Sequence, residues 1–309
     1  MYSSRFCGYP GDVAFSDIPR IYCFSLGDFY NFERCYFGFL VKHHLQKKYE
    51  LAEGSFNSTV GSLLDLAIKK LHLAKAYNQP LDYLLPSLFK AAEQDIREQA
   101  DREGPHSFYG STIKFLTPEA MQKAQQVFKN YYLKRKGKIN RAILNKRFWE
   151  CILEGERVFK IWGGPDAIEQ GDDGIPEIVD YKYFEDAQKG RDNLDMDLMP
   201  KLYTLLCSTE LIKSGYKRVR FRVRSWTDPE DESLYEQFDL DNASLLKDFF
   251  RHKITKILSV AEISFCGKDY CKACNSEQKD EWIKQLKLKN KDYSIFGIIA
   301  QVRLNRLSP

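Results

Sequence analysis

The stretch "GIPEIVDYKYFEDA", residues 174–187, decides the fold of this chain. A Gly-Ile-Pro turn leads into an apolar run that ends on Asp180 and Lys182. Because side chains alternate between the two faces of a strand, Asp180 and Lys182 share one face and Tyr181 takes the other. Ile178 and Val179 make both faces apolar, which is typical of a strand buried on two sides.

The Asp-x-Lys tripeptide has two interpretations. The common one is an exposed ion pair that contributes little to stability. The other is a site for a divalent cation, because Asp166 lies fourteen residues upstream of Asp180, at the end of the strand-like segment 157–163. A hairpin between the two segments would bring both carboxylates together beside Lys182, and cations such as Mg²⁺ prefer carboxylate oxygens.

The composition sets limits on the class of protein. The chain has 309 residues, of which 43% are hydrophobic and 29% charged, as in ordinary globular proteins. The net charge of +4 is compatible with a polyanionic partner but does not require one. No apolar run approaches the roughly 18 residues that span a bilayer, and the start lacks the features of a signal peptide. We therefore expect a cytoplasmic protein without membrane contact, whose eight cysteines are metal ligands or buried thiols.

The apolar spacing predicts a mixed fold. Helices are predicted over residues 25–50, 59–78, 81–104, 117–135 and 196–215. Strands are predicted over residues 157–163, 176–182 and 216–226. Ser25 with Asp28 forms a capping-box variant, and Thr117 before Pro118 is a second helix start. This order indicates an α/β or α+β core with a helical insertion, in one main domain.

Two basic stretches are candidates for contact with nucleic acid. The run 134–147 has seven basic residues and no acidic one, which favours a phosphate-binding patch or a solvated helical face. Its candidate residues are Lys134, Arg135, Lys136, Lys138 and Arg141. Four arginines alternate with apolar residues over 216–226, and we expect them on the exposed side of an edge strand rather than along a DNA backbone. They are Arg218, Arg220, Arg222 and Arg224. Tyr181 and Tyr183 are expected mainly in the core, with base stacking as the alternative.

The motifs "GGPDAI" and "GIPEIVDYK" together resemble the PD-(D/E)XK nuclease superfamily, specifically its RecB-like exonuclease branch. An early helix of that branch carries a cysteine, and "ERCYFGFL" is similar, with Cys35 in the matching place. Its Q-h-x-x-Y motif is matched at Tyr203, with Met199 where the glutamine would be. Its G-x-x-x-H motif is similar to "GSLLD", with Asp65 in place of the metal-binding histidine.

The resemblance implies a restriction-endonuclease-like core with a central mixed sheet flanked by helices. In this arrangement residues 1–24 would form an N-terminal lead-in, and residues 25–235 would form the nuclease core, with a helical insertion at about 75–147. The Cys-rich C-terminal segment 236–309 would pack on that core. It also implies a metal-dependent DNA nuclease, an exonuclease acting on single-stranded ends in CRISPR adaptation or break repair, with partner proteins in such a complex.

The resemblance assigns roles to the site residues. Asp65, Asp166 and Asp180 would hold Mg²⁺ or Mn²⁺. Lys182 would position the attacking water, and Tyr203 would steady Lys182 or a phosphate oxygen. The substitutions at positions 65 and 199 favour the alternative of a DNA-binding scaffold whose catalysis has decayed. A further alternative is an RNA-binding protein that has a structural zinc site and does not hydrolyse its ligand.

The late cysteines form a second constellation. Cys266, Cys271 and Cys274 have the spacing C-x4-C-x2-C. One early and three late cysteines are the arrangement of CRISPR-associated RecB-like and AddB-type nucleases, so Cys35 would complete the ligands of a 4Fe–4S cluster. Structural Zn²⁺ is the alternative, held by the four thiolates or by three with His252. The remaining cysteines are expected to be buried or incidental thiols. They are Cys7, Cys23, Cys151 and Cys207.

Overall fold

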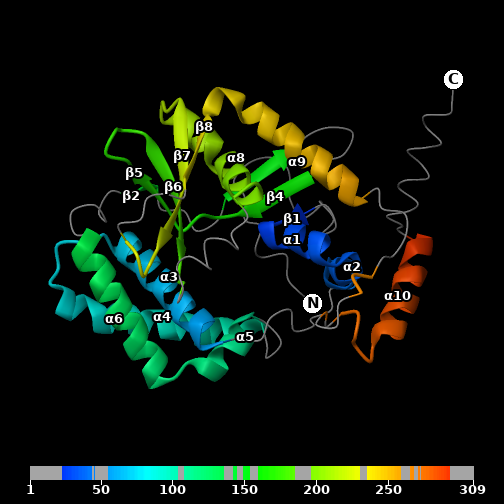
Figure 1. The fold of residues 1–309 in the computed structure, drawn as a ribbon, viewed down its shortest axis with the longest axis horizontal. Coiled ribbons are helices and arrows are strands. Elements are labelled where there is room, and N and C mark those ends of the chain that lie inside the picture. Colours follow the sequence, from blue (N-terminus) through cyan, green and yellow to red (C-terminus); the bar gives the residue numbers. More distant parts are fainter. Residues whose placement is uncertain are drawn as a thin grey trace. The chain divides into compact units, whose positions relative to one another are not determined.

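The structure is a computed structural model that divides into two compact units (Figure 1). Unit 1 comprises Met1–Tyr49, Glu150–Gly163 and Ser244–Pro309, and unit 2 comprises Glu50–Trp149 and Gly164–Ala243. The described residues are 23–43, 45, 55–103, 108–135, 142–144, 149–153, 159–184, 196–229, 235–258, 265–267, 271 and 273–292. In the described part of the chain, no helix is long and apolar enough to cross a membrane.

Unit 2 contains a mixed sheet with the strand order β2-β5-β6-β7-β8. Its strands are β2 (Ala142–Leu144), β5 (Ala167–Gln170), β6 (Pro176–Lys182), β7 (Arg218–Ser225) and β8 (Tyr235–Asp239). The strands β5 and β6 form an antiparallel hairpin. The strands β6 and β7 run parallel, so they need a long crossover, which contains α8 (Leu198–Lys213). The predicted central mixed sheet is therefore confirmed.

The turn before β6 depends on two glycines. Gly174 has φ +81°, a backbone conformation that residues with a Cβ atom rarely adopt. A Cβ on Gly171 would lie 2.5 Å from the carbonyl oxygen of Ile175, which already accepts the Gly171 N–H at 2.9 Å. This tight turn sets the register of the hairpin, and β6 beyond it is buried on both faces up to Lys182, as predicted.

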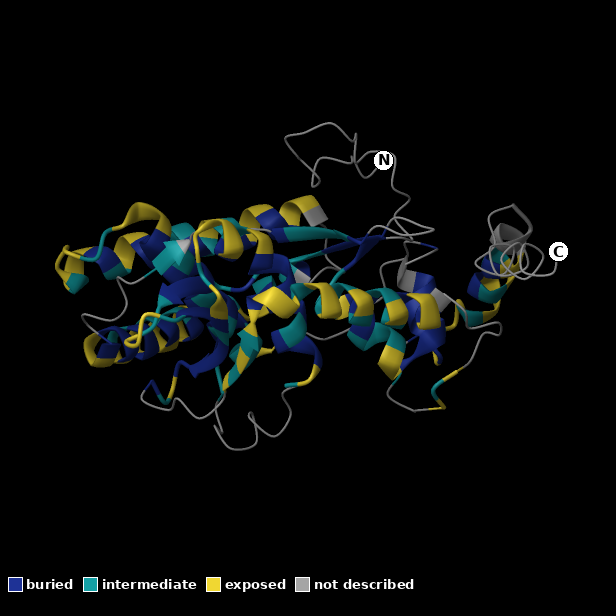
Figure 2. Ribbon diagram, turned by 90° about the horizontal axis from the view of Figure 1, so that it is seen from above, coloured by how far each residue is buried: buried dark blue, intermediate teal, exposed yellow. Residues whose placement is uncertain are grey.

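Helices cover one face of this sheet. They are α3 (Phe56–Ala74), α4 (Leu81–Glu103), α5 (Phe108–Thr112), the 3-10 turn η3 (Ile113–Phe115) and α6 (Pro118–Arg135). Their apolar sides form one core cluster with Val179 and Tyr181 of β6 and with Trp226. Figure 2 shows helices buried along one side and exposed along the other. The predicted cap of α6 is confirmed, because the Ala120 N–H donates to Thr117 Oγ1 at 3.2 Å.

Unit 1 contains a smaller sheet of order β1-β4-β3 and four helices among its described residues. The elements are β1 (Cys23–Phe24), α1 (Leu26–Arg34), α2 (Tyr36–His43), β3 (Trp149–Leu153), β4 (Phe159–Gly163), α9 (Ala243–Leu258) and α10 (Lys279–Asp292). Ser25 starts α1 with the expected capping box, in which its N–H donates to Asp28 Oδ2 at 2.8 Å. The single helix predicted over 25–50 is wrong, because Cys35 is extended (φ −162°, ψ 109°) and separates α1 from α2.

The hairpin that brings Asp166 and Asp180 together differs from the predicted one. The segment 157–163 contributes β4, which pairs in parallel with β1 in the sheet of unit 1. The partner of β6 is β5, a four-residue strand that begins directly after Asp166. Asp166 therefore precedes its strand instead of ending one, although the two carboxylates still meet across a hairpin.

Candidate active site and four-cysteine site

Two buried aspartates meet at the end of the β5–β6 hairpin. The backbone N–H of Asp166 donates to the Val179 carbonyl at 3.0 Å, and Asp166 Oδ2 accepts the Tyr181 N–H at 2.8 Å. Asp180, with 3% of its surface exposed, is ion-paired with Lys182 on the same strand face. The exposed ion pair is thus excluded for this tripeptide, since its carboxylate is buried.

Helix α3 adds a third carboxylate and a second lysine. Asp65 Oδ1 accepts the Trp226 Nε1–H at 3.3 Å. Lys69 Nζ lies 2.8 Å from Asp166 Oδ1. Residues four apart share one helix face, so α3 presents Asp65 and Lys69 together. Lys69 was not among the predicted site residues, although its spacing of four residues from Asp65 was a signal for it.

The pKa values of the three aspartates reflect burial first and the neighbouring charges second. Burial, reinforced by Asp166, raises the pKa of Asp65 to about 8. Burial also raises the pKa of Asp180, and Lys182 offsets only part of this effect. Burial would raise the pKa of Asp166 as well, but Lys69 and Lys182 outweigh it and hold this pKa below its usual value.

Both lysines remain charged. The carboxylate of Asp166 is the main reason why the pKa of Lys69 is raised. Burial would lower the pKa of Lys182, but Asp180 and Asp166 overcome this effect and raise it. The site therefore combines the carboxyl groups of three aspartates with two ammonium groups that stay protonated at neutral pH.

This donor set suits a hard divalent cation. Carboxylate oxygens are the ligands that Mg²⁺ and Mn²⁺ prefer. Asp166 raises the pKa of both Asp65 and Asp180, and a bound cation would relieve this repulsion among like charges. Within the described residues, however, only the four cysteines have all their ligand atoms within 4.8 Å of one another.

The Q-h-x-x-Y match lies on α8. The Tyr203 ring stacks on Phe221 of β7, with 6.0 Å between ring centroids. Met199, which occupies the glutamine position, has 3% of its surface exposed. Position 199 therefore contributes apolar packing in this chain.

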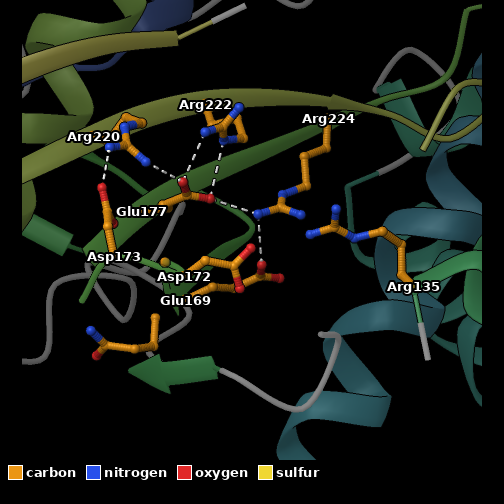
Figure 3. Close-up of a pocket in the computed structure, with 10 residues that line it drawn as sticks. Arg135, Glu169, Asp172, Asp173, Glu177, Arg220, Arg222 and Arg224 are labelled. Carbon is orange, nitrogen blue, oxygen red and sulfur yellow. Dashed lines mark hydrogen bonds and ion pairs between the residues drawn. The ribbon is translucent and has the colours of Figure 1, made fainter. Parts of the chain in front are cut away.

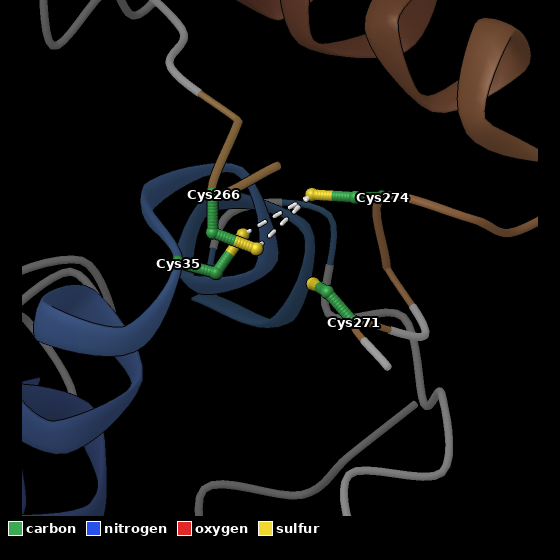
Figure 4. Close-up of side chains that lie close together, drawn as sticks. All are labelled: Cys35, Cys266, Cys271 and Cys274. Atoms are coloured by element: carbon green, nitrogen blue, oxygen red, sulfur yellow. Dashed lines mark hydrogen bonds between the residues drawn. The ribbon is translucent and has the colours of Figure 1, made fainter. Parts of the chain in front are cut away.

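Four cysteines gather in unit 1 (Figure 4). Cys35 comes from the break between α1 and α2, while the other three precede α10. Cys274 Sγ lies 3.4 Å from Cys35 Sγ and 3.8 Å from Cys266 Sγ. Cys271 completes the group, in which all sulfur atoms lie within 4.8 Å of one another. None of the four forms a disulfide, and His252 is exposed on α9 outside the group.

The chemistry of this group fits a metal centre. Burial raises the pKa of Cys35 and of Cys274, so a metal would have to displace their protons on binding. Tetrahedral Zn²⁺ with Zn–S bonds of about 2.3 Å places sulfur atoms roughly 3.8 Å apart. The observed spacing accommodates one such ion. In a four-iron cluster each thiolate binds its own iron, and the sulfur atoms stand further apart.

The arginines of β7 are placed differently from the prediction. β7 lies between β6 and β8, so it is not an edge strand. Arg222 and Arg224 each have 5% of their surface exposed and are ion-paired with Glu177. The predicted exposed face is wrong because acidic partners from β5 and β6 lie on the same side of the sheet. Arg218 alone among the four is exposed, 4.0 Å from Asp239.

The candidate phosphate-binding run 134–147 begins in the last two residues of α6, which differ in their exposure. Lys134 is exposed, but Arg135 is buried with 6% of its surface exposed, so it cannot belong to an exposed patch. Lys136, Lys138 and Arg141 lie outside the described residues. Tyr181 is buried against Trp226 and Tyr131, which confirms its place in the core.

The remaining cysteines follow the expectation of incidental thiols where they are described. Cys23 and Cys207 are buried and Cys151 is half-buried, whereas Cys7 lies outside the described residues.

Comparisons with known proteins support the reading of the fold. A family model described as the PD-(D/E)XK nuclease superfamily matches residues 24–278. No curated protein matches the chain. The crystal structure of SSO0001 is 13% identical, covering 77% of this chain and 90% of that chain, with a TM-score of 0.26. The structure of Scheffersomyces stipitis Rai1 in complex with (3'-NADP)+ and calcium ion is 12% identical over 78% of this chain and 68% of that chain, with a TM-score of 0.20. At these TM-scores neither structure carries an argument about this chain.

Proposed function

Because the chain belongs to the PD-(D/E)XK nuclease superfamily, we propose that it hydrolyses phosphodiester bonds in DNA with a divalent cation. The observation that carries this proposal is the buried group of Asp166, Asp180 and Lys182, joined from α3 by Asp65 and Lys69. A purely structural ion pair would not need three carboxylates and two lysines at one strand end.

The side chains have separate tasks in the proposed reaction. Asp65, Asp166 and Asp180 would hold Mg²⁺ or Mn²⁺, which when bound polarises the phosphate and lowers the pKa of its water. Lys182 stabilises the negative charge that develops on the phosphate and orients the attacking water. Its raised pKa keeps it protonated at neutral pH, so it acts as a cation rather than as a general base.

The placement of Asp65 favours an active enzyme over a decayed scaffold. Although this residue replaces the histidine of the related motif, it interacts electrostatically with Asp166 and Lys182 and would supply an oxygen ligand. Exonuclease action on single-stranded ends, with partner proteins in CRISPR adaptation or break repair, is the finer proposal. It rests on the resemblance of the Cys35 and Tyr203 motifs to the RecB-like branch.

We also propose that the four thiolates hold a metal centre that ties the α1–α2 segment to the chain before α10. The motif resemblance favours a 4Fe–4S cluster, and the sulfur spacing accommodates Zn²⁺. Either centre would cross-link residues 35 and 274, which are 239 positions apart in the sequence. Its role would be structural, because the proposed catalytic residues all come from unit 2.

The test is cleavage of end-labelled single-stranded DNA, double-stranded DNA and RNA by protein purified without oxygen. We expect cleavage of DNA with Mg²⁺ or Mn²⁺ and none after chelation. Asp180→Asn should lose metal affinity and cleavage together, while the exposed Asp101→Asn on α4 should match the parent. A folded parent that cuts no substrate with any divalent cation would refute the proposal and support the scaffold.

A further inference from the structure

A polar pocket lies on the sheet face opposite to Asp180 and Lys182. Its volume is about 170 Å³, and its walls come from β5, β6, β7 and the end of α6 (Figure 3). Strand alternation places Glu177 on this face, whereas Asp180 points to the other. The side chains that matter are Arg135, Glu169, Glu177, Arg220, Arg222 and Arg224. The proposed cleavage reaction uses none of them.

The carboxylate of Glu177 has no capacity left for further donors. Its Oε1 accepts from Arg220 Nη1 at 2.8 Å and from Arg222 Nη2 at 2.9 Å. Its Oε2 accepts from Arg222 Nε at 3.1 Å and from Arg224 Nη2 at 2.7 Å. A carboxylate offers about four acceptor positions, so these bonds fill them.

Two guanidinium donors around the filled carboxylate have no hydrogen-bond partner. The Nε atoms of Arg220 and Arg224 are buried without a hydrogen-bond partner. Arg224 has only 5% of its surface exposed, and its Nη2 already serves both Glu177 and Glu169. A buried donor without an acceptor is costly, so both guanidiniums have hydrogen-bonding capacity that their carboxylate partners do not use.

Four arginines and four acidic residues line the pocket, and among the buried ones positive charge is in excess. Three buried guanidiniums, those of Arg135, Arg222 and Arg224, face the two buried carboxylates of Glu169 and Glu177. Figure 3 shows the guanidiniums of Arg135 and Arg224 pointing toward one another.

The acids at the rim do not cancel this excess. Arg220 is shared with Asp173, whose carboxylate lies 2.7 Å from Arg220 Nη2 and is half exposed. Asp172 is exposed at the rim. Solvent screens both rim charges more than the buried ones.

We propose that this pocket binds a phosphate group, either as free phosphate or a mononucleotide, or as the terminal phosphate of a nucleic-acid strand. The planar fork of arginine matches phosphate oxygens, and a doubly charged anion offsets the buried positive charge. The volume admits one such anion with several waters. This pocket is separate from the proposed cleavage site, so an experiment can refute either proposal without refuting the other.

The first experiment measures binding of inorganic phosphate to the full chain by isothermal titration calorimetry, at pH 7 and fixed ionic strength. The parent should bind phosphate. Arg220→Gln should weaken binding by roughly 10- to 100-fold, the scale of a charge-assisted hydrogen bond, while Glu177 keeps Arg222 and Arg224. Asp172→Asn at the rim should tighten binding.

The control is Arg97→Gln, which removes an exposed arginine paired with Glu93 on α4 and should leave binding unchanged. Unfolding midpoints show that each variant is folded. If the parent gives no binding heat, or if Arg220→Gln binds as the parent does, the arginines form only an ion-pair framework and the proposal fails.

The second experiment distinguishes the sources of the phosphate, without added divalent cation so that no strand is cut. Deoxyadenosine monophosphate and two oligonucleotides, with a 5'-phosphate and with a 5'-hydroxyl, compete against inorganic phosphate. If the 5'-phosphorylated oligonucleotide competes and the 5'-hydroxyl oligonucleotide does not, the pocket binds the phosphate at a strand end. Competition by the mononucleotide alone assigns it to a free ligand.

Discussion

Lys182→Met should remove most of the cleavage activity without weakening the metal site. Methionine keeps the length of the side chain but removes the charge and all three donors. The side chain of Lys182 is 35% exposed, so a phosphate can approach its ammonium group. Loss of one positioned group that stabilises developing charge costs roughly 10²- to 10³-fold in turnover.

The metal affinity should respond in the opposite direction. Asp65, Asp166 and Asp180 all remain, and Asp180 loses the ammonium that competes with a cation. We therefore expect unchanged or tighter binding of Mg²⁺. Without metal, the variant should be destabilised by about 1–3 kcal/mol, because a buried carboxylate loses its partner. Added Mg²⁺ should restore part of that stability.

The assay is single-turnover cleavage of labelled DNA at saturating protein across a Mg²⁺ titration, with thermal unfolding measured in parallel. Lys70→Met is a matched control, because Lys70 Nζ lies 2.8 Å from Asp95 and its side chain is 33% exposed. That change should shift stability by less than about 1 kcal/mol and leave cleavage alone. Cleavage by Lys182→Met within a few-fold of the parent would show that this lysine only neutralises charge.

Three further predictions concern other parts of the chain. Burial lowers the pKa of His72 to about 4, so the unfolded chain takes up a proton first and stability should fall between about pH 6.5 and 4. The free energy of unfolding should fall by an amount on the order of 3 kcal/mol over this range. In His72→Gln the free energy of unfolding should depend less on pH, and an equal pH dependence in parent and variant would contradict the assignment to His72. The parent should contain about four irons per chain if the thiolates hold a 4Fe–4S cluster, or one zinc ion if they hold Zn²⁺. Cys274→Ser should lose this metal, and a parent that is stable without any metal would refute the proposed metal centre. Lys134→Ala should reduce the salt dependence of DNA affinity by about one unit of slope, with turnover at saturating DNA unchanged, and an unaltered slope would place this lysine outside the interface.

Local patterns accounted for the parts of the fold that depend on neighbours in sequence. The two apolar faces of β6 and the capped starts at Ser25 and Thr117 follow from spacings of a few residues. The partner strand of β6 did not follow from its pattern, because the short β5 contains Glu169, a charged residue that is buried and contacts Tyr181 and Arg224, which are distant in sequence.

The arginine face of β7 shows a second limit of pattern reading. Alternating arginines look the same in a sequence whether they face solvent or buried acids. Their burial depends on Glu177, which comes from a strand 40 or more residues away in sequence. In the candidate active site, the spacing of Asp166 and Asp180 was visible in the sequence. Asp65 and Cys35 came only from family resemblance, because nothing local distinguishes them from other residues nearby in the sequence.

The discontinuity of unit 1 has a consequence for how the chain is made on the ribosome. All of unit 2 is synthesised by residue 243, whereas unit 1 still awaits its last segment. At about 5–20 residues per second, the 239 positions between Cys35 and Cys274 take roughly 10–50 s to translate. Until Cys266 is made, Cys35 is a thiol without any of its three later partners and is open to oxidation. The four-cysteine site is therefore completed last, and metal can enter it only after nearly the whole chain has been translated.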